Sequence, residues 1–134
     1  MQVFEFVADA TTMPRWYAAV TSVDPVGQAG PGAGARFRAV RSLPGGPAVN
    51  VVERVTWLPG EEVTFTSVSG PTPFRYRYLL APTATGTRLT LHGEISAEGL
   101  PGPARHLGGV ADHFFRPGMA ANLRTLARLL DLGR

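Results

Sequence analysis

The sequence predicts an α+β domain in which an antiparallel sheet is closed by a long C-terminal helix. Between residues 20 and 95, apolar and polar residues alternate in short runs separated by Gly- and Pro-rich turns. That pattern is typical of an antiparallel meander with one buried face. Residues 107–130 instead carry apolar side chains at helical spacing. The length of 134 residues fits a single domain, which we expect to cover residues 1–134.

The first residues predict two short helices ahead of the sheet. The apolar residues of Gln2–Ala8 suit an amphipathic helix. Thr11 and Thr12 offer a cap for a second short helix over residues 13–17, where Pro14 fits the first turn.

Six runs with period-two alternation or turn-bounded apolar residues predict the strands. They are Val20–Val26, Arg36–Val40, Val49–Trp57, a run around Val63 and Phe65, Phe74–Leu80 and Leu89–Ile95. Six arginines are expected on the outer, solvated face, and we do not expect this face to bind nucleic acid. They are Arg36, Arg38, Arg54, Arg75, Arg77 and Arg88.

The end of the chain predicts the helix that covers the sheet. Its two apolar stripes consist of Leu107, Val110, Ala111 and Phe114, and of Met119, Leu123, Leu126 and Leu130. Pro117 lies between the stripes and should kink or split the helix. A curved sheet wrapped around this helix leaves space between them, so we expect an apolar pocket of about a few hundred Å³.

The composition excludes several kinds of chemistry. The sequence contains no Cys and no Lys, which excludes disulfides, thiolate nucleophiles and Schiff-base catalysis within this chain. With 44% hydrophobic and 17% charged residues, a soluble domain is expected, with neither a signal peptide nor a membrane span. We therefore predict a cytoplasmic protein. The net charge of +3 is an ordinary solubility charge.

Several segments together resemble the helix-grip superfamily, also called START-like or SRPBCC. These segments are Val3–Asp9, Met13–Tyr17, Gly34–Phe37, Phe74–Tyr78 and Gly86–Leu91. The superfamily includes polyketide cyclases/dehydratases, START lipid-transfer domains and small ligand-binding proteins. The resemblance implies a curved antiparallel sheet wrapped around the C-terminal helix, and it extends over nearly the whole chain. Because the matching residues serve packing and turns, it implies the fold more strongly than an activity.

The sequence departs from the usual pattern of this superfamily at its first strand. Members usually carry a strand before the first helix, whereas here that helix is predicted from residue 2. Either the true start of the protein lies upstream, or the sheet has six strands rather than seven, and we expect six strands in this chain. The strands Val20–Val26 and Leu89–Ile95 would then have open edges, through which a homodimer could form.

Glu53 and two tyrosines are the first candidates for chemistry. Strand parity places Glu53 with Val51 and Val55 on the apolar face, where a carboxylate could act as an acid, a base or a ligand anchor. Two structural alternatives are an ion pair with an arginine at the rim and a bulge that reverses the parity. Tyr76 and Tyr78 share the inward face with Phe74, where a hydroxyl could stabilise an enolate or could only fill space.

Further candidates are histidines and a wall of aromatic side chains. His113 could serve as a base at the cavity edge, whereas His106 lies about 10 Å away along the helix, too far for both to bind one metal ion. No metal site and no cofactor are expected. The candidate ligand-binding residues, each of which could be core instead, are Trp16, Phe37, Trp57, Phe65, Phe74, Tyr78, Phe114, Phe115 and Asn122.

The predicted function is binding of a small hydrophobic or aromatic, polyketide-like molecule in the internal cavity. The domain could catalyse cofactor-free cyclisation or dehydration of this molecule. Glu53 or His113 would then move the proton, and a hydroxyl such as that of Tyr76 would hold the oxyanion. The alternative is a non-catalytic binder or carrier of lipids or other apolar metabolites.

Overall fold

The computed structural model describes residues 2–27, 30–43, 45–95 and 120–130, and it has the predicted α+β architecture. The described elements are α1 (Gln2–Ala8), the 3₁₀ helix η1 (Ala10–Arg15) and the strands β1 (Val20–Val26), β2 (Arg36–Leu43), β3 (Gly46–Leu58), β4 (Glu62–Ser69), β5 (Phe74–Pro82) and β6 (Thr87–Ile95). Residues 120–130 form a further helix. The six described strands pair with their sequence neighbours in the order β1 to β6, always antiparallel.

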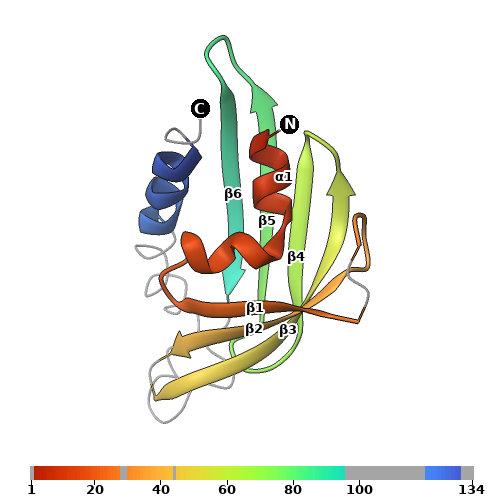
Figure 1. Ribbon diagram of the computed structural model, residues 1–134, viewed down its shortest axis with the longest axis vertical. Helices are drawn as coiled ribbons and strands as arrows, with labels where there is room; N and C mark the ends of the chain where they lie inside the picture. The colour runs from red at the N-terminus through yellow and green to blue at the C-terminus, as the bar shows by residue number, and fades with distance from the viewer. Residues whose placement is uncertain (1, 28–29, 44, 96–119, 131–134) are drawn as a thin grey trace.

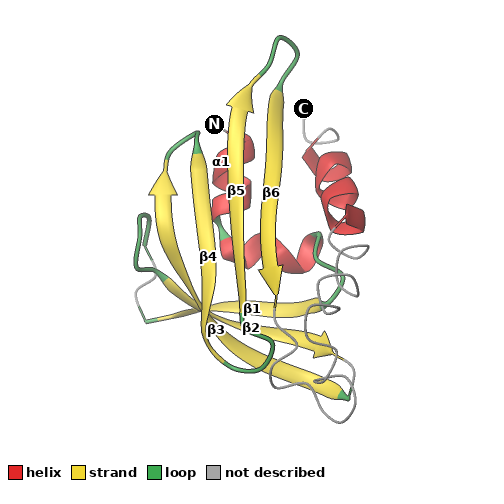
Figure 2. Ribbon diagram, turned by 180° about the vertical axis from the view of Figure 1, so that it is seen from behind, coloured by secondary structure: helices red, strands yellow, loops and turns green. Residues whose placement is uncertain are grey.

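The helices lie around one side of this sheet. Helix α1 and η1 cover one of its faces, and the helix of residues 120–130 lies beside β6 (Figures 1 and 2). The cap of η1 is Asp9, whose Oδ1 accepts a hydrogen bond of 3.0 Å from the backbone N–H of Thr11. The prediction that Thr11 and Thr12 cap this helix is therefore wrong. Among the described helices, none is long and apolar enough to cross a membrane.

The sheet bends sharply along β3. In Figure 1, β1 and β2 run across the lower part of the molecule, at a steep angle to β4, β5 and β6. The pairing of β3 with β4 shifts register twice, between Val51 and Val52 and between Arg54 and Thr56. Such bulges increase local twist and bend the strand that carries them. The second shift also places Arg54 and Trp57 on the same inner side although they are three residues apart.

The core fills the space between the inner face of the sheet and α1 and η1. Its largest fully buried side chains include Trp16, Tyr78, Phe4 and Phe65. Leu126 joins this core from the helix of residues 120–130. The predicted inward residues of β5 are correct, because Phe74, Tyr76 and Tyr78 are all buried whereas Arg75 and Arg77 between them are exposed.

Two parts of the sequence-based expectation are not tested. The strands β1 and β6 are the edges of the described sheet, but self-association through them stays a prediction. Residues 96–119 lie outside the described residues, and so do the predictions for His106, His113, Phe114 and Phe115 and for the kink at Pro117.

Candidate functional site

An inner cavity lies between the sheet, the segment around η1 and the helix of residues 120–130. It has a volume of about 90 Å³, less than the sequence-based expectation. Most of its described lining is apolar, and four of the described lining side chains bring polar groups: Tyr17, Arg41, Tyr76 and Asn122. An apolar cavity with a few convergent polar groups is the usual form of a small-molecule site.

An aromatic stack forms one wall of this cavity. The ring of Tyr76 stacks on Phe74 with centroids 4.7 Å apart, and it also stacks on Tyr17 at 5.8 Å. The guanidinium carbon of Arg41 lies 4.8 Å from the ring centre of Phe74. Burial raises the pKa of Tyr76 to about 12, although the nearby charge of Arg41 acts in the opposite direction. The Tyr76 hydroxyl therefore stays protonated at neutral pH and can donate a hydrogen bond to a ligand.

A second tyrosine pair closes the site toward the core. The hydroxyls of Tyr17 and Tyr78 share a hydrogen bond, and Tyr78 is fully buried. Burial raises the pKa of both tyrosines well above the ordinary value. Tyr78 is not part of the described cavity lining, and its hydrogen bond orients the hydroxyl of Tyr17.

Arg41, like Tyr17, lines the cavity although it was not among the site residues predicted from the sequence. It lies on β2 in the inward register of Phe37 and Ala39, and it is only 6% exposed. Its Nε donates to Oδ1 of Asn50 at 2.9 Å, and its Nη2 donates to the carbonyl of Pro71 at 3.0 Å. Extending the alternation of Phe37 and Ala39 by two residues would have predicted this inward position.

The turn between β4 and β5 fits closely around this arginine. Nη2 of Arg41 also donates to the hydroxyl of Thr72, which has a left-handed φ of 48°. Gly70 has a φ of 101°, and a Cβ there would collide with the backbone of Val49 and the side chain of Asn50. The turn therefore needs glycine at this position to bring its carbonyls to Arg41 and Asn50.

The predicted inward placement of Glu53 is wrong. On β3 the buried residues are Asn50, Val52 and Arg54, so Glu53 faces the other side of the sheet. Its Oε1 forms an ion pair of 2.9 Å with Nε of Arg36, whose side chain is 52% exposed. The alternative of an ion pair with an arginine is thus what the structure contains. Proton transfer by Glu53 inside the cavity has no geometric support.

The outward placement of Arg54 is wrong for the same reason. Arg54 is 3% exposed, and its three nitrogen atoms donate to the backbone carbonyls of Gly32, Ala8 and Gly30. Burial lowers its pKa. It anchors the loop before β2 and the end of α1, where a cation suits the helix dipole.

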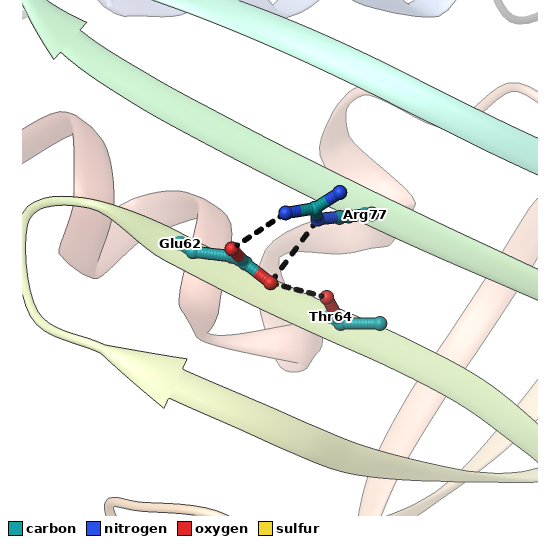
Figure 3. A network of polar contacts seen from close by, with 3 residues as sticks. All are labelled: Glu62, Thr64 and Arg77. Atoms are coloured by element: carbon teal, nitrogen blue, oxygen red, sulfur yellow. Dashed lines mark hydrogen bonds and ion pairs between the residues drawn. The ribbon is translucent and has the colours of Figure 1, made fainter.

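The outer face carries the other arginines as predicted. Arg77 makes two hydrogen bonds to Glu62, of 3.1 and 3.2 Å, and Thr64 donates to the same carboxylate (Figure 3). The hydrogen bond from Arg77 lowers the pKa of Glu62. This network belongs to the outer surface of β4 and β5 and does not touch the cavity.

The predicted ligand-binding residues divide into two groups. Phe74 and Asn122 line the cavity, and Oδ1 of Asn122 accepts a hydrogen bond of 3.0 Å from the backbone N–H of Ala18. The other described ones pack against core residues instead of lining the cavity, namely Trp16, Phe37, Trp57, Phe65 and Tyr78. For these residues the structure supports the alternative of core packing.

A second apolar hollow of about 250 Å³ lies between α1, β6 and the helix of residues 120–130. Its described lining has no titratable side chain and consists of Val3, Thr87, Leu89, Leu123, Leu126, Ala127 and Leu130. The smaller inner cavity is the better candidate site because it combines an apolar wall with directed polar groups. Within the described ranges, no group of three or more His, Asp or Glu side chains could hold a metal ion.

These features define the class of the protein as a helix-grip domain, with an antiparallel sheet curved around helices and an inner cavity between them. More specifically, the chain belongs to the polyketide cyclase / dehydrase and lipid transport family, whose sequence model matches residues 1–131. The sequence-based resemblance to this superfamily is confirmed. No curated protein matches the chain in sequence.

Solved structures with the same fold are distant in sequence. TTHA0849 from Thermus thermophilus is 22% identical with a TM-score of 0.68, over 95% of this chain and 83% of that one. A START superfamily protein from Mycobacterium smegmatis is 16% identical with a TM-score of 0.66, over 98% and 89%. The Zhui aromatase/cyclase from Streptomyces sp. R1128 is 11% identical with a TM-score of 0.71, over 92% and 81%. At such identities the similarity shows the fold alone.

Proposed function

We propose that this protein binds a small aromatic or otherwise hydrophobic molecule in the inner cavity. The observation that carries the proposal is the stacked wall of Tyr17, Tyr76 and Phe74, which lines a cavity that also contains Arg41 and Asn122. Aromatic rings can pack edge-to-face against the edges of such a wall, and the polar groups can fix a ligand's orientation. Membership of a family that includes polyketide cyclases and lipid-transport proteins supports the same class of ligand.

Cyclisation of the bound molecule is the second candidate function. It is favoured by the Tyr76 hydroxyl, which remains protonated in the cavity and could donate a hydrogen bond to a developing oxyanion. The described lining of the cavity contains no carboxylate or imidazole that could serve as a base. Of the two residues that the sequence suggested for proton transfer, Glu53 faces away from the cavity and His113 lies outside the described residues. Simple binding is therefore the function that the described residues support better.

A neutral fluorescent probe, N-phenyl-1-naphthylamine, tests the binding proposal. The probe is larger than the cavity of about 90 Å³, so its binding requires the lining residues to move apart. We expect saturable binding at one site, with increased emission as the probe leaves water. Two Ala-to-Leu substitutions identify the site, because Ala39 lines the inner cavity whereas Ala127 lines the hollow beside β6. Filling the inner cavity with Ala39→Leu should abolish binding, and Ala127→Leu should leave it unchanged.

The fold of both variants is checked by circular dichroism, because overpacking a core costs about 1–3 kcal/mol. Loss of binding only in Ala127→Leu would move the site to the hollow beside β6. No saturable binding to the wild-type protein would contradict the proposed function.

A further inference from the structure

The inner cavity contains a buried positive charge, and no carboxylate of the described residues forms an ion pair with it. Among the described residues, the ion pairs join Arg36 to Glu53 and Arg77 to Glu62, both away from the cavity. Arg41 is 6% exposed and lines the cavity together with mostly apolar residues. A charge in such a place lowers stability unless hydrogen bonds and an opposite charge compensate it.

Neutral groups accept the hydrogen bonds of two of the three guanidinium nitrogens of Arg41. Its Nε and Nη2 donate to Asn50, Pro71 and Thr72. Asn50 is fixed in turn, because its Nδ2 donates to the carbonyls of Ser69 and Pro71 at 3.1 and 2.9 Å. The guanidinium is therefore preorganised before any ligand arrives, which reduces the entropy lost on binding.

The remaining nitrogen of Arg41 is available to a ligand. Nη1 donates to none of the described residues. Every fully buried side-chain nitrogen or oxygen atom among these residues does have a hydrogen-bond partner, so Nη1 is not one of the fully buried atoms. Nη1 therefore keeps accessible surface, and it belongs to a side chain that lines the cavity. Arg54 offers a contrast, because all three of its nitrogens donate to backbone carbonyls and it does not line the cavity.

We propose that Arg41 is an anion-binding residue, and that the ligand of the inner cavity is a small aromatic molecule with a carboxylate. The carboxylate would accept a charge-assisted hydrogen bond from Nη1 of Arg41, while the ring would pack against the edges of Tyr76 and Phe74. The protonated hydroxyl of Tyr76 lines the same cavity and can donate to the second carboxylate oxygen. This inference rests on the proposed function and makes it more specific in ligand chemistry.

Two isosteric probes test the assignment, 2-naphthoate and 2-naphthamide. They share the ring and differ in charge, and both are measured by calorimetry and by displacement of N-phenyl-1-naphthylamine at neutral pH. Because a hydrogen bond to a charged group contributes more than a neutral one, the wild-type protein should bind the naphthoate about tenfold more tightly. Arg41→Met should reduce naphthoate affinity about tenfold or more and naphthamide affinity by less, so that the preference for naphthoate is lost.

Two further variants serve as controls. Arg38 lies on the same strand with its side chain exposed, so Arg38→Met removes an equal charge outside the cavity and should keep the naphthoate preference. Arg41→Lys keeps the charge without the planar fork and should retain part of the preference.

The results separate the two proposals. If N-phenyl-1-naphthylamine does not bind the wild-type protein, the proposed function fails. If the probe binds but the wild-type protein shows no preference for naphthoate, the assignment of Arg41 is overturned while the proposed function stands. This comparison uses the wild-type protein, so it decides the assignment even if Arg41→Met does not fold. An equal preference in folded Arg41→Met would also overturn the assignment.

Discussion

Glu53 and Arg54 are neighbours in the chain, yet they lie on opposite faces of β3 and in very different surroundings. Glu53 faces outward and pairs with a half-exposed arginine, at 2.9 Å. Arg54 faces inward, is nearly fully buried and donates to three backbone carbonyls. The comparison teaches that the ion pairs of the described sheet are surface features, whereas its buried arginines are held by neutral carbonyls, hydroxyls and amides.

The inner face should therefore be far more sensitive to substitution than the outer face. Arg54→Met gives the largest expected effect, because it leaves three carbonyls of the loop and α1 without their donor. It also removes a cation–π contact, in which the guanidinium carbon lies 4.4 Å from the ring centre of Trp57. We expect the free energy of unfolding to fall by about 3 kcal/mol or more, measured by urea denaturation.

Arg38→Met is the matched control for Arg54→Met, because it removes an exposed arginine from the neighbouring strand. Its free energy of unfolding should change by less than about 0.5 kcal/mol. Equal losses in the two variants would contradict the contrast between the faces.

The substitution of Tyr76 should have an effect of intermediate size, which appears in the pH dependence of stability. Its pKa is raised by burial from 10.0 to about 12, so the folded protein holds this proton more tightly than the unfolded chain does. The contribution of this proton to the free energy of unfolding is fully present below pH 10 and is lost as the pH rises toward 12. This difference in pKa between the folded and unfolded protein corresponds to about 2–3 kcal/mol.

The variant Tyr76→Phe isolates this contribution. Tyr17 and Tyr78 also have raised pKa values and should still destabilise the fold at alkaline pH. The stability of Tyr76→Phe, measured by urea denaturation across the alkaline range in which Tyr76 titrates, should fall less steeply than that of the wild-type protein. Parallel profiles would mean that the Tyr76 hydroxyl is not buried as described.

The residues of the inner face also differ from strand to strand in how well the sequence could predict them. On β5 the alternation of aromatic residues with Arg75 and Arg77 agrees with burial, so the inward set was predicted correctly. On β3 the inward residues include Asn50 and Arg54, whereas Val49 and Val55 are exposed. Hydrophobic alternation therefore predicted the wrong parity there.

The partners that make these polar side chains suitable for the interior lie far away in the sequence. Arg54 depends on carbonyls of Ala8, Gly30 and Gly32, and Arg41 depends on the turn at Pro71 and Thr72. No local sequence pattern predicts such contacts, because they form only once the sheet has curved. The same is true of the bulge after Arg54, which returns Trp57 to the inner face. The strands, their order and the fold class depend on local alternation and turns, and these could be predicted.

Glu53→Gln should have the smallest effect of these substitutions, and it tests the outer face most directly. The substitution removes the negative charge opposite Arg36 but keeps a side chain that can accept the same hydrogen bond. Because exposed ion pairs contribute about 0–1 kcal/mol, the free energy of unfolding should change by no more than that. Binding of N-phenyl-1-naphthylamine and of 2-naphthoate should be unchanged, since the cavity lies on the other face of the sheet. A loss of ligand binding in a folded Glu53→Gln variant would place this carboxylate in the site after all and would remove the distinction between the two faces.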